Sequence, residues 1–217
     1  LTSLILAMDE VDSTLGHFTS YLKDWSARSF KYMKLRVPDL IVNEREHSVI
    51  QGDVFSALNK VNVDFAYYDP PYGSNNEKMP PSRVRYASYY HIWSTICKND
   101  KPTLFGAAGR RADSSDKIAV SAFEEFRKDE NGYYLAVKAI DDLIKQTNAR
   151  YIALSYSSGG RATAEELNQV LKKHGSLIKT IEFDYKKNVM ADMKWTNEWL
   201  REAEQPNKEF IFLIRKF

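Results

Sequence analysis

An apolar, aromatic stretch that ends in two prolines most strongly constrains how this chain can fold. Residues 64–68 are an apolar, aromatic run of the type found in strands, and Asp69-Pro70-Pro71-Tyr72-Gly73 follows them directly. Proline has no backbone N–H and cannot continue a sheet ladder, so the strand has to end at Asp69. In an open α/β sheet, ligands bind outside the carboxyl ends of the strands. The sequence therefore predicts that Asp69 and Tyr72 lie in a crevice, on a rigid turn.

The chemistry of this turn favours a planar ligand that carries an amino group. The prolines leave the carbonyls of Asp69 and Pro70 without competing local N–H donors, so the turn presents a carboxylate and one or two carbonyl oxygens as acceptors. Tyr72 adds a flat aromatic face at the same place. Adenine fits both features, because it can stack on the ring and donate its NH2 to the acceptors.

Composition excludes some classes of protein and leaves others open. The 217 residues are enough for one α/β domain with its own core, and no uninterrupted apolar run is long enough to cross a membrane. The formal net charge of +2 neither requires nor excludes nucleic acid, so a DNA surface would have to be a local patch. With Cys97 as the single cysteine, the chain can form neither an internal disulfide nor a thiolate metal cluster. We expect a soluble protein of the reducing cytoplasm, without a metal site.

Hydrophobic periodicity places helices and strands along the chain. Apolar residues at three- and four-residue steps predict a helix from Leu1 to about Lys34, which Gly16 could break, within a helical segment over 1–46. Further helices are predicted over 54–60, 86–98, 118–128, 133–148 and 163–174, and strands over 47–51, 61–68, 102–106, 150–156, 177–185 and 209–216. Asp53 is suited to cap one helix, Thr163 and Glu166 form a capping box for another, and Gly175 is suited to end it.

The order of these elements predicts an α/β fold. The last two strands partly alternate apolar and polar residues, which suits an antiparallel pair at the end of the sheet. We expect one domain over residues 1–217, with a mixed sheet, an antiparallel terminal hairpin and flanking helices. If the strands that end at Asp69 and at Tyr156 are parallel, the glycine-containing loop 157–161 lies at the same sheet edge as Asp69. This loop could hold a cofactor or a base, and a simple strand-to-helix turn explains it equally well.

Three polar loops are candidates for contact with DNA. The loop over about 73–85 follows the proline turn and carries Arg83 and Arg85, the loop over 107–117 carries Arg110 and Arg111, and a third spans 186–207. Arginine side chains of this kind reach phosphates or base edges, and an ordinary exposed loop is the competing interpretation. In the helix that begins at Tyr86, we assign Ile92, Trp93 and Ile96 to the core. The roles of Tyr86, Tyr90 and His91 stay open.

Asp69-Pro70-Pro71-Tyr72 resembles the Asp-Pro-Pro-Tyr motif of adenine-specific DNA methyltransferases, most closely the class called D12. The resemblance extends over most of the chain. Leu1 to Lys23 is similar to that family's helical segment before the motif, and Tyr90-His91 with Trp93 resembles its helix after the motif. Leu154-Ser155-Tyr156 with Gly159-Gly160 resembles its later strand and loop.

The resemblance implies a Rossmann-like, S-adenosylmethionine-dependent fold and transfer of a methyl group to adenine N6 in DNA, with the base flipped out of the duplex. In such a site Asp69 and the Pro70 carbonyl hold the amino group and Tyr72 stacks on the base. The residues implied for catalysis are Asp69, Pro70 and Tyr72; for the cofactor, Asp53, Val54 and Asp69; and for DNA, Pro71, Tyr72, Arg83, Arg85, Tyr86, Arg110 and Arg111. Asp53 as a plain helix cap is compatible with a place beside the cofactor.

One element of the family's pattern does not occur in this sequence. The family holds its cofactor with a strand that ends in a Phe-x-Gly-x-Gly type turn, and none of the nine glycines follows a phenylalanine in that pattern. We expect residues upstream, or a second chain, to supply that turn, and this chain alone to bind cofactor weakly or not at all. The resemblance implies a site-specific enzyme, the modification half of a restriction–modification pair. An RNA adenine or guanine methyltransferase and a non-catalytic DNA-binding subunit of a split methyltransferase stay open as alternatives.

Overall fold

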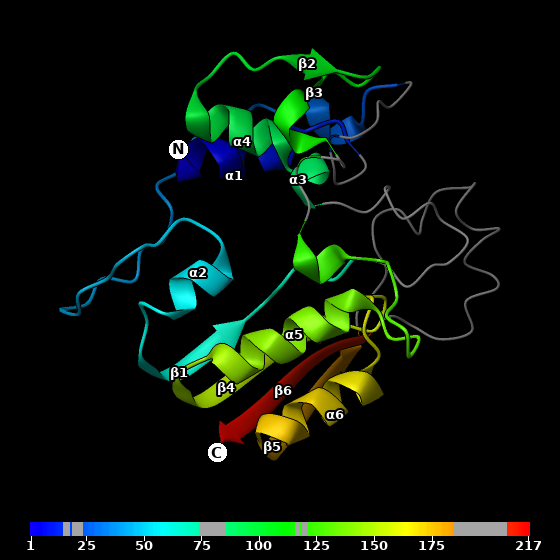
Figure 1. Cartoon of the computed structure of the whole chain (residues 1–217). Coiled ribbons are helices and arrows are strands. Elements are labelled where there is room, and N and C mark those ends of the chain that lie inside the picture. The colour runs from blue at the N-terminus through cyan, green and yellow to red at the C-terminus, as the bar shows by residue number, and fades with distance from the viewer. Residues whose placement is uncertain (15–17, 19–23, 74–85, 116–117, 119–120, 185–207) are drawn as a thin grey trace. The chain divides into compact units, whose positions relative to one another are not determined.

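The computed structural model describes residues 1–14, 18, 24–73, 86–115, 118, 121–184 and 208–217 (Figure 1). The chain divides into two compact units. The first, called here the helical unit, comprises Leu1–Ser48 with Arg85–Ala119, and the second, called the sheet unit, comprises Val49–Val84 with Val120–Phe217. The single domain expected from the sequence stays a prediction. In the described part of the chain, no helix has the length and hydropathy needed to span a membrane.

The sheet unit is built on four strands in the order β1-β4-β6-β5. Strands β1 (Val63–Tyr68) and β4 (Ala149–Ser157) are parallel, whereas β6 (Lys208–Lys216) runs antiparallel to both β4 and β5 (Gly175–Asp184). This arrangement confirms the predicted mixed sheet with an antiparallel pair at its end. The parallel register pairs Tyr68 with Leu154, so β1 and β4 end at the same edge.

One face of the sheet carries the core of this unit. Figure 1 shows helices α5 (Leu135–Gln146) and α6 (Ala164–His174) against the same face. Alternate residues of β4 and β6 point into this layer because side chains alternate across a strand. Each large apolar side chain that is fully buried stabilises the fold by about 1.5–3 kcal/mol. The large buried side chains of these two strands are Ile152, Leu154, Tyr156, Phe210, Phe212 and Ile214.

The other side of β1 is much less covered by the described residues. Phe65 and Tyr67 alternate with the half-buried Ala66 and Tyr68, and they remain 53% and 55% exposed. Within the described part of the sheet unit, β1 is therefore half-buried on one face and exposed on the other.

Two helix starts follow the predicted capping chemistry. Helix α2 (Val54–Leu58) begins where the Asp53 carboxylate accepts bonds from the backbone N–H of Phe55 and Ser56, at 3.0 and 3.3 Å. Helix α6 begins with the predicted capping box, in which Thr163 accepts from the Glu166 N–H while the Glu166 carboxylate accepts from the Thr163 N–H.

Helix α6 ends where it was predicted to end, with His174 as its last residue and Gly175 as its C-cap. Its φ of −175° is extended backbone, and strand β5 begins at this residue. Glycine is needed here for space, because a Cβ would lie 2.5 Å from the carbonyl oxygen of Arg215 on β6.

The helical unit contains helices α1 (Thr2–Val11), α3 (Tyr86–Tyr89) and α4 (His91–Lys98). It also contains the 3-10 turns η1 (Ala27–Phe30) and η3 (Ala112–Ser114) and an antiparallel ribbon of β2 (Leu104–Phe105) and β3 (Arg110–Arg111). The helix predicted over 86–98 is thus divided at Tyr90, and the strand predicted over 102–106 is confined to two residues. Ile92, Trp93 and Ile96 are partly buried.

The long N-terminal helix predicted to about Lys34 is wrong beyond Val11. At Asp12 the backbone becomes extended, with ψ of 152°. The Asp12 carbonyl accepts from the side chains of Ser26 and Arg28, at 3.1 and 2.8 Å, and the Thr14 hydroxyl bonds to the Asp12 carboxylate. The Thr14 bond is a local alternative to helical bonding, whereas the bonds from Ser26 and Arg28 come from 14 and 16 residues further along the chain. Apolar periodicity registers none of the three bonds. Residues 15–17 and 19–23 of the predicted helix lie outside the described residues.

Two further predicted elements are absent from the described residues. Residues 47–51 form no strand and are exposed. In the segment 118–128, the described residues form no α-helix, and their one helical element is the 3-10 turn η4 (Ala122–Glu124). Its start is capped by the Ser121 hydroxyl, and its end is stopped where the Glu125 carboxylate binds the N–H groups of Phe126 and Arg127.

Candidate active site

The proline corner lies where the sequence places it, directly after β1. Strand β1 ends at Tyr68, Asp69 is exposed, and Pro70 is buried. Because β4 runs parallel to β1, its last residues and the loop after Ser157 lie at the same sheet edge. The structure therefore brings together two segments that the sequence marks as candidates, residues 69–73 and 154–161.

The hydroxyl of Tyr72 holds the carboxylate of Asp69. It donates to Asp69 Oδ1 at 2.5 Å and lies 3.3 Å from Ser155 Oγ. Burial, reinforced by the bond to Asp69, raises the pKa of Tyr72 well above its usual value. The phenol is therefore neutral at physiological pH and remains a donor. Among the described residues, no arginine or lysine pairs with Asp69, and only the tyrosine bond orients its carboxylate.

The main chain of the corner is tied to the loop after β4. The Tyr72 carbonyl accepts from the Arg161 N–H at 2.8 Å and from the Tyr156 hydroxyl at 3.1 Å. The Tyr72 ring also packs on the Tyr156 ring, with 4.9 Å between centroids. Gly73 has a left-handed φ of 64°, and a Cβ there would lie 2.8 Å from Arg161 Cγ, so both backbone and space require glycine.

A second carboxylate, that of Glu209, lies near this corner. Glu209 is paired with Ser157 across β4 and β6, so the first residues of β6 lie at the edge where β4 ends. Partial burial raises the pKa of Glu209, and the negative charge of Asp69 raises it further. Glu209 is not among the site residues predicted from the sequence. The first residues of an antiparallel last strand lie beside the end of its neighbour, and this rule could have indicated Glu209 from the sequence.

The residues expected to hold the cofactor also lie in the sheet unit. Asp53 is exposed at the start of α2 and uses Oδ1 to cap the helix, while Val54 packs against the core. An exposed carboxylate can accept bonds from a ligand's hydroxyl or amino groups while it caps, since it has about four lone-pair sites. In the described residues no cluster of histidine, cysteine and acidic side chains could hold a metal ion.

The residues expected to touch DNA are described only in part. Arg83 and Arg85, the rest of the loop after Gly73, residues 116–117 and the loop 186–207 lie outside the described residues. Pro71 is half-buried and Tyr86 is exposed at the start of α3, with its ring 5.6 Å from that of Tyr90. The Arg110 guanidinium lies 4.7 Å from the centre of the Phe105 ring.

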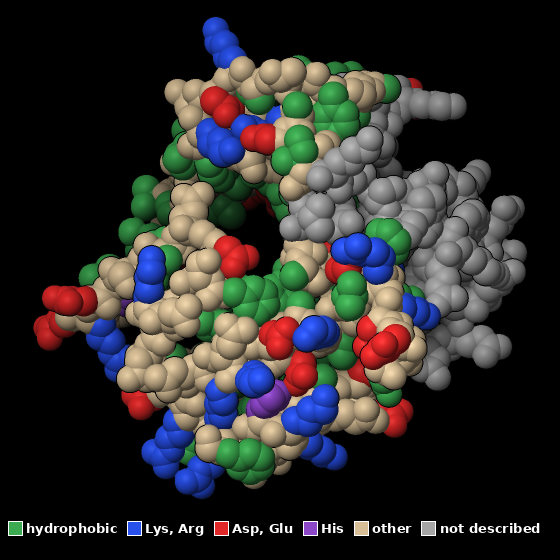
Figure 2. Space-filling model, viewed as in Figure 1, with side chains coloured by type: hydrophobic (Ala, Val, Ile, Leu, Met, Phe, Trp, Pro, Cys, Tyr) green, Lys and Arg blue, Asp and Glu red, His purple; other side chains and the backbone are tan. Residues whose placement is uncertain are grey.

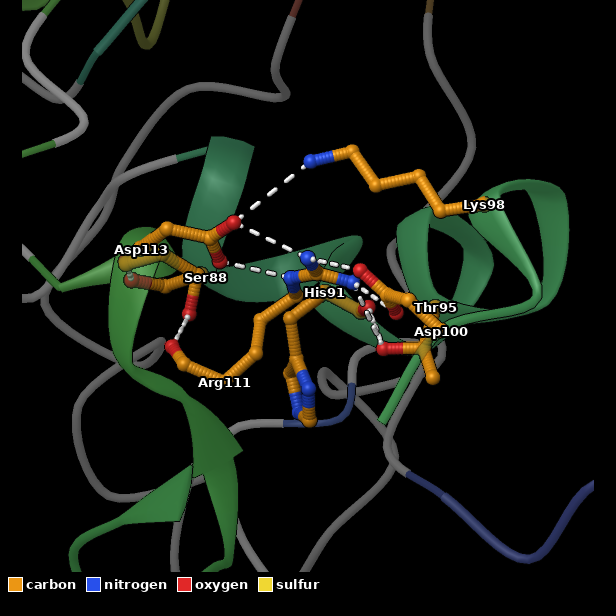
Figure 3. Close-up of polar contacts among 8 residues, drawn as sticks. Ser88, His91, Thr95, Lys98, Asp100, Arg111 and Asp113 are labelled. Carbon is orange, nitrogen blue, oxygen red and sulfur yellow. Dashed lines mark hydrogen bonds and ion pairs between the residues drawn. The ribbon is translucent and has the colours of Figure 1, made fainter. Parts of the chain in front are cut away.

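The structure corrects the assignment of Arg111 to the DNA surface. Figure 3 shows its guanidinium between Asp100 and Asp113, and its side chain is 4% exposed. It donates to Asp100 at 2.8 and 3.0 Å, to Asp113 at 2.6 and 2.9 Å, and to the Thr95 hydroxyl at 3.1 Å. The bond from Arg111 lowers the pKa of Asp113 to about 2. A guanidinium occupied in this way is not available to a phosphate.

His91 is also a structural residue in this unit. Its side chain is buried, and Nε2 lies 3.0 Å from the Phe18 carbonyl oxygen. The sequence analysis left its role open, and this contact assigns it to packing.

The outer surface of α5 and α6 is not a basic patch. Figure 2 shows acidic and basic side chains intermingled over this face. Lys138 pairs with Asp142, while Lys173 and His174 both pair with Asp141. Paired charges of this kind suit a solvated face better than a phosphate backbone.

Comparison with known proteins assigns the chain to a class. The family model for D12 class N6 adenine-specific DNA methyltransferases matches residues 1–155, and the chain belongs to this family. The resemblance drawn from the proline corner is thereby confirmed, as is the mixed α/β fold expected from it.

The relatives are modification enzymes that are much longer than this chain. Over 216 residues the chain is 31% identical to the type II methyltransferase M.FokI of Planomicrobium okeanokoites, which covers 100% of the chain and 30% of that protein. It is 28% identical over 173 residues to the modification methylase StsI of Streptococcus sanguinis, covering 80% of the chain and 24% of that protein. The chain thus spans less than a third of either relative. No solved structure matches it.

Proposed function

We propose that this chain forms the adenine-binding part of a DNA methyltransferase active site, in which a methyl group passes from S-adenosylmethionine to N6 of a flipped-out adenine. The observation that carries the proposal is the Asp69 carboxylate at the end of β1, exposed and oriented by the Tyr72 hydroxyl. An oriented acceptor at a strand's carboxyl end suits a ligand that donates N–H groups.

In this proposal Asp69 and the Pro70 carbonyl accept the two amino hydrogens of adenine. Tyr72 occupies only part of the acceptor capacity of the carboxylate, so the adenine can bind without displacing it. Two such bonds draw the nitrogen lone pair out of conjugation with the ring and aim it at the methyl group. The contribution of the protein is then positioning and preorganised electrostatics, because the methyl donor is already activated as a sulfonium.

Members of this family use S-adenosylmethionine, and we assign Asp53, Val54 and Asp69 to its binding. The exposed oxygen of Asp53 beside the start of α2 suits a hydroxyl or amino group of such a ligand. Since the Phe-x-Gly-x-Gly turn is not found among the 217 residues, we propose that another segment of the protein or a second chain supplies it.

For DNA we assign Pro71, Tyr72, Arg83, Arg85, Tyr86 and Arg110. Arg110 is supported by its half-exposed position on the β2–β3 ribbon, and Arg83 and Arg85 rest on the sequence alone. We further propose that the protein acts in the cytoplasm as the site-specific modification enzyme of a restriction–modification pair. The name of the relative StsI, a modification methylase, supports this role.

The test is methyl transfer by the full-length protein that contains this sequence. Radiolabelled S-adenosylmethionine is supplied with matched DNA and RNA duplexes, and the methylated nucleoside is identified by mass spectrometry. We expect N6-methyladenine in DNA. Label found only in RNA would support the RNA methyltransferase alternative instead.

A second measurement addresses the missing glycine turn. Calorimetric titration of this chain with S-adenosylmethionine is expected to show little heat, and binding is expected when the remainder of the protein or a partner chain is present. Binding to DNA without methyl transfer under either condition would favour a non-catalytic DNA-binding subunit.

A further inference from the structure

Tyr156 connects the two segments of the candidate site, and the sequence alone marks it as an ordinary core residue. It lies near the end of β4, in a run of apolar strand residues, and it is 1% exposed. Its hydroxyl accepts from the Ala162 N–H at 3.1 Å and donates to the Tyr72 carbonyl at 3.1 Å. A phenol can do both at once, because its oxygen accepts while its hydrogen donates.

The Tyr156 ring is held as closely as its hydroxyl. It packs against the Tyr72 ring at 4.9 Å on one side. At Gly160, a Cβ would lie 2.4 Å from Tyr156 Cε1, so the loop backbone touches the ring directly. The tyrosine therefore fills the space between the corner and the loop and leaves little room for either to move.

We propose that Tyr156 is a positioning residue for methyl transfer, which holds Tyr72 and through it Asp69 in the geometry that receives the adenine amino group. This inference rests on the proposed function and deepens it. The connection runs from the Ala162 N–H to the Tyr156 hydroxyl, to the Tyr72 carbonyl, and from the Tyr72 hydroxyl to Asp69. Each step is a hydrogen bond between described residues of the sheet unit.

The hydroxyl of Tyr156 is suited to this role over a wide pH range. Burial raises its pKa to about 12, so it stays protonated and continues to donate to the Tyr72 carbonyl wherever the protein is folded. A misplacement of about 1 Å at a reacting centre can lower the rate by about 100-fold. Because the Arg161 N–H still holds the Tyr72 carbonyl when Tyr156 does not, we expect a smaller effect from removing this one bond.

The decisive variant is Tyr156→Phe in the full-length protein, which keeps the ring and removes the hydroxyl. We expect kcat for DNA adenine methylation to fall by about 10-fold, with KM for DNA within about 2-fold of the wild type, because the bond orients the acceptor and does not bind DNA. Circular dichroism establishes that the variant is folded at the assay temperature.

The matched control is Thr147→Val, which removes another buried hydroxyl of the same unit at the opposite end of β4. The Thr147 hydroxyl bonds to the Leu143 carbonyl and to the hydroxyl of Tyr68, the residue before the corner, both at 2.7 Å, and neither of these bonds is made to residues 69–73. This variant is expected to lose stability and to keep kcat within about 2-fold of the wild type. Equal losses of kcat in both variants, in proportion to their loss of stability, would reduce Tyr156 to a structural residue and overturn the proposal.

A second variant keeps the proposal testable if Tyr156→Phe does not fold. Gly160→Ala places a methyl group against the Tyr156 ring and so displaces the tyrosine while its hydroxyl is retained. It is expected to lower kcat without raising KM for DNA, and an unchanged kcat in either folded variant contradicts the positioning role. Absence of adenine methylation by the wild-type protein would instead overturn the proposed function, and the inference with it.

Discussion

Two polar clusters of this protein use the same types of group in opposite ways. In the helical unit, the buried guanidinium of Arg111 is surrounded by Asp100, Asp113 and Thr95, and its donors are used within the cluster. In the sheet unit, the Asp69 carboxylate is exposed, and the Tyr72 hydroxyl alone orients it among the described residues. The first cluster is closed to ligands and the second is open.

The difference teaches how a charged side chain is assigned to structure or to function. A buried charge has to be paired, and once paired it has little capacity left for a ligand. An exposed carboxylate that is oriented by one neutral donor has lost its freedom to rotate, but it can still accept hydrogen bonds from a ligand. The contrast predicts that substitutions in the open cluster affect chemistry, whereas substitutions in the closed cluster affect stability.

The largest effect is expected for Asp69→Asn. The amide keeps the shape of the side chain, but it removes the charge and turns one acceptor into a donor that repels the adenine amino group. We expect kcat to fall by about 100- to 1,000-fold, the typical cost of losing one preorganised electrostatic group, with little change in thermal stability. Single-turnover methylation of a DNA duplex measures the first quantity and circular dichroism the second. Turnover close to that of the wild type would show that Asp69 does not hold the amino group.

Tyr72→Phe separates two roles of one side chain and should have a smaller effect. The sequence assigns Tyr72 to stacking on the base, which phenylalanine preserves, while the structure adds a hydroxyl that orients Asp69. If the orienting bond matters, kcat should fall by about 10-fold, as expected for a looser acceptor in an otherwise intact site. Steady-state kinetics with DNA measure it, and Tyr151→Phe on β4 serves as the control. Wild-type kcat in Tyr72→Phe would leave stacking as the role of this residue.

The adjacent residues Arg110 and Arg111 provide the sharpest test of the difference between a charged side chain that is available to a ligand and one that is paired within the protein. Arg110→Gln should weaken DNA binding and reduce the slope of log K against log salt by about one unit, as the loss of one phosphate contact does. Arg111→Gln should leave that slope unchanged and lower the Tm by on the order of 5 °C, because it breaks the cluster with Asp100 and Asp113. Fluorescence anisotropy with a labelled duplex at several salt concentrations gives the slopes. If Arg111→Gln reduced the salt slope and Arg110→Gln lowered only the Tm, our assignment of these two residues would be reversed.

The smallest effect is an acid dependence of stability that arises from Asp113. Its folded pKa of about 2 lies below the ordinary value of 3.8, so its ionised form is favoured by folding. The resulting stabilisation is complete above pH 4 or so and is lost as the pH falls from there through about 2. Asp113→Asn should therefore lower the Tm at pH 6 and approach the wild type near pH 2. A Tm difference between Asp113→Asn and the wild type that grows as the pH falls would have the wrong sign for this ion pair.

The fold was predictable to the extent that local patterns decide it. The strand before Asp69, the strand through Leu154, helix α5 and the capped start of α6 follow from periodicity, proline and capping residues, because each depends on neighbours a few positions away. The helix predicted to Lys34 failed because Asp12 bonds to Ser26 and Arg28, which periodicity does not report. The helix predicted over 118–128 failed for a similar reason, since Glu125 binds nearby backbone N–H groups.

The candidate site was predictable at its proline corner and unpredictable around it. Pro70 and Pro71 require the strand to end, whatever surrounds them. The bond from the Tyr156 hydroxyl to the Tyr72 carbonyl and the pairing of Glu209 with Ser157 depend on strand direction and register, which the sequence leaves open. Arg110 and Arg111 are indistinguishable in the sequence, and opposite faces of a two-residue strand separate them.

The amino-acid sequence by itself determined that a strand ends in an aromatic corner rich in hydrogen-bond acceptors. It also determined the mixed α/β class of the fold and the methyltransferase family of the chain. Covalent geometry and local propensity suffice for this, because a proline restricts its own backbone in any fold. Only the tertiary structure decided which charged groups are paired and which are open, since burial and hydrogen-bond partners depend on segments that lie far apart in the chain. For this reason the motif could be found from the sequence, and the neighbours that orient it could not.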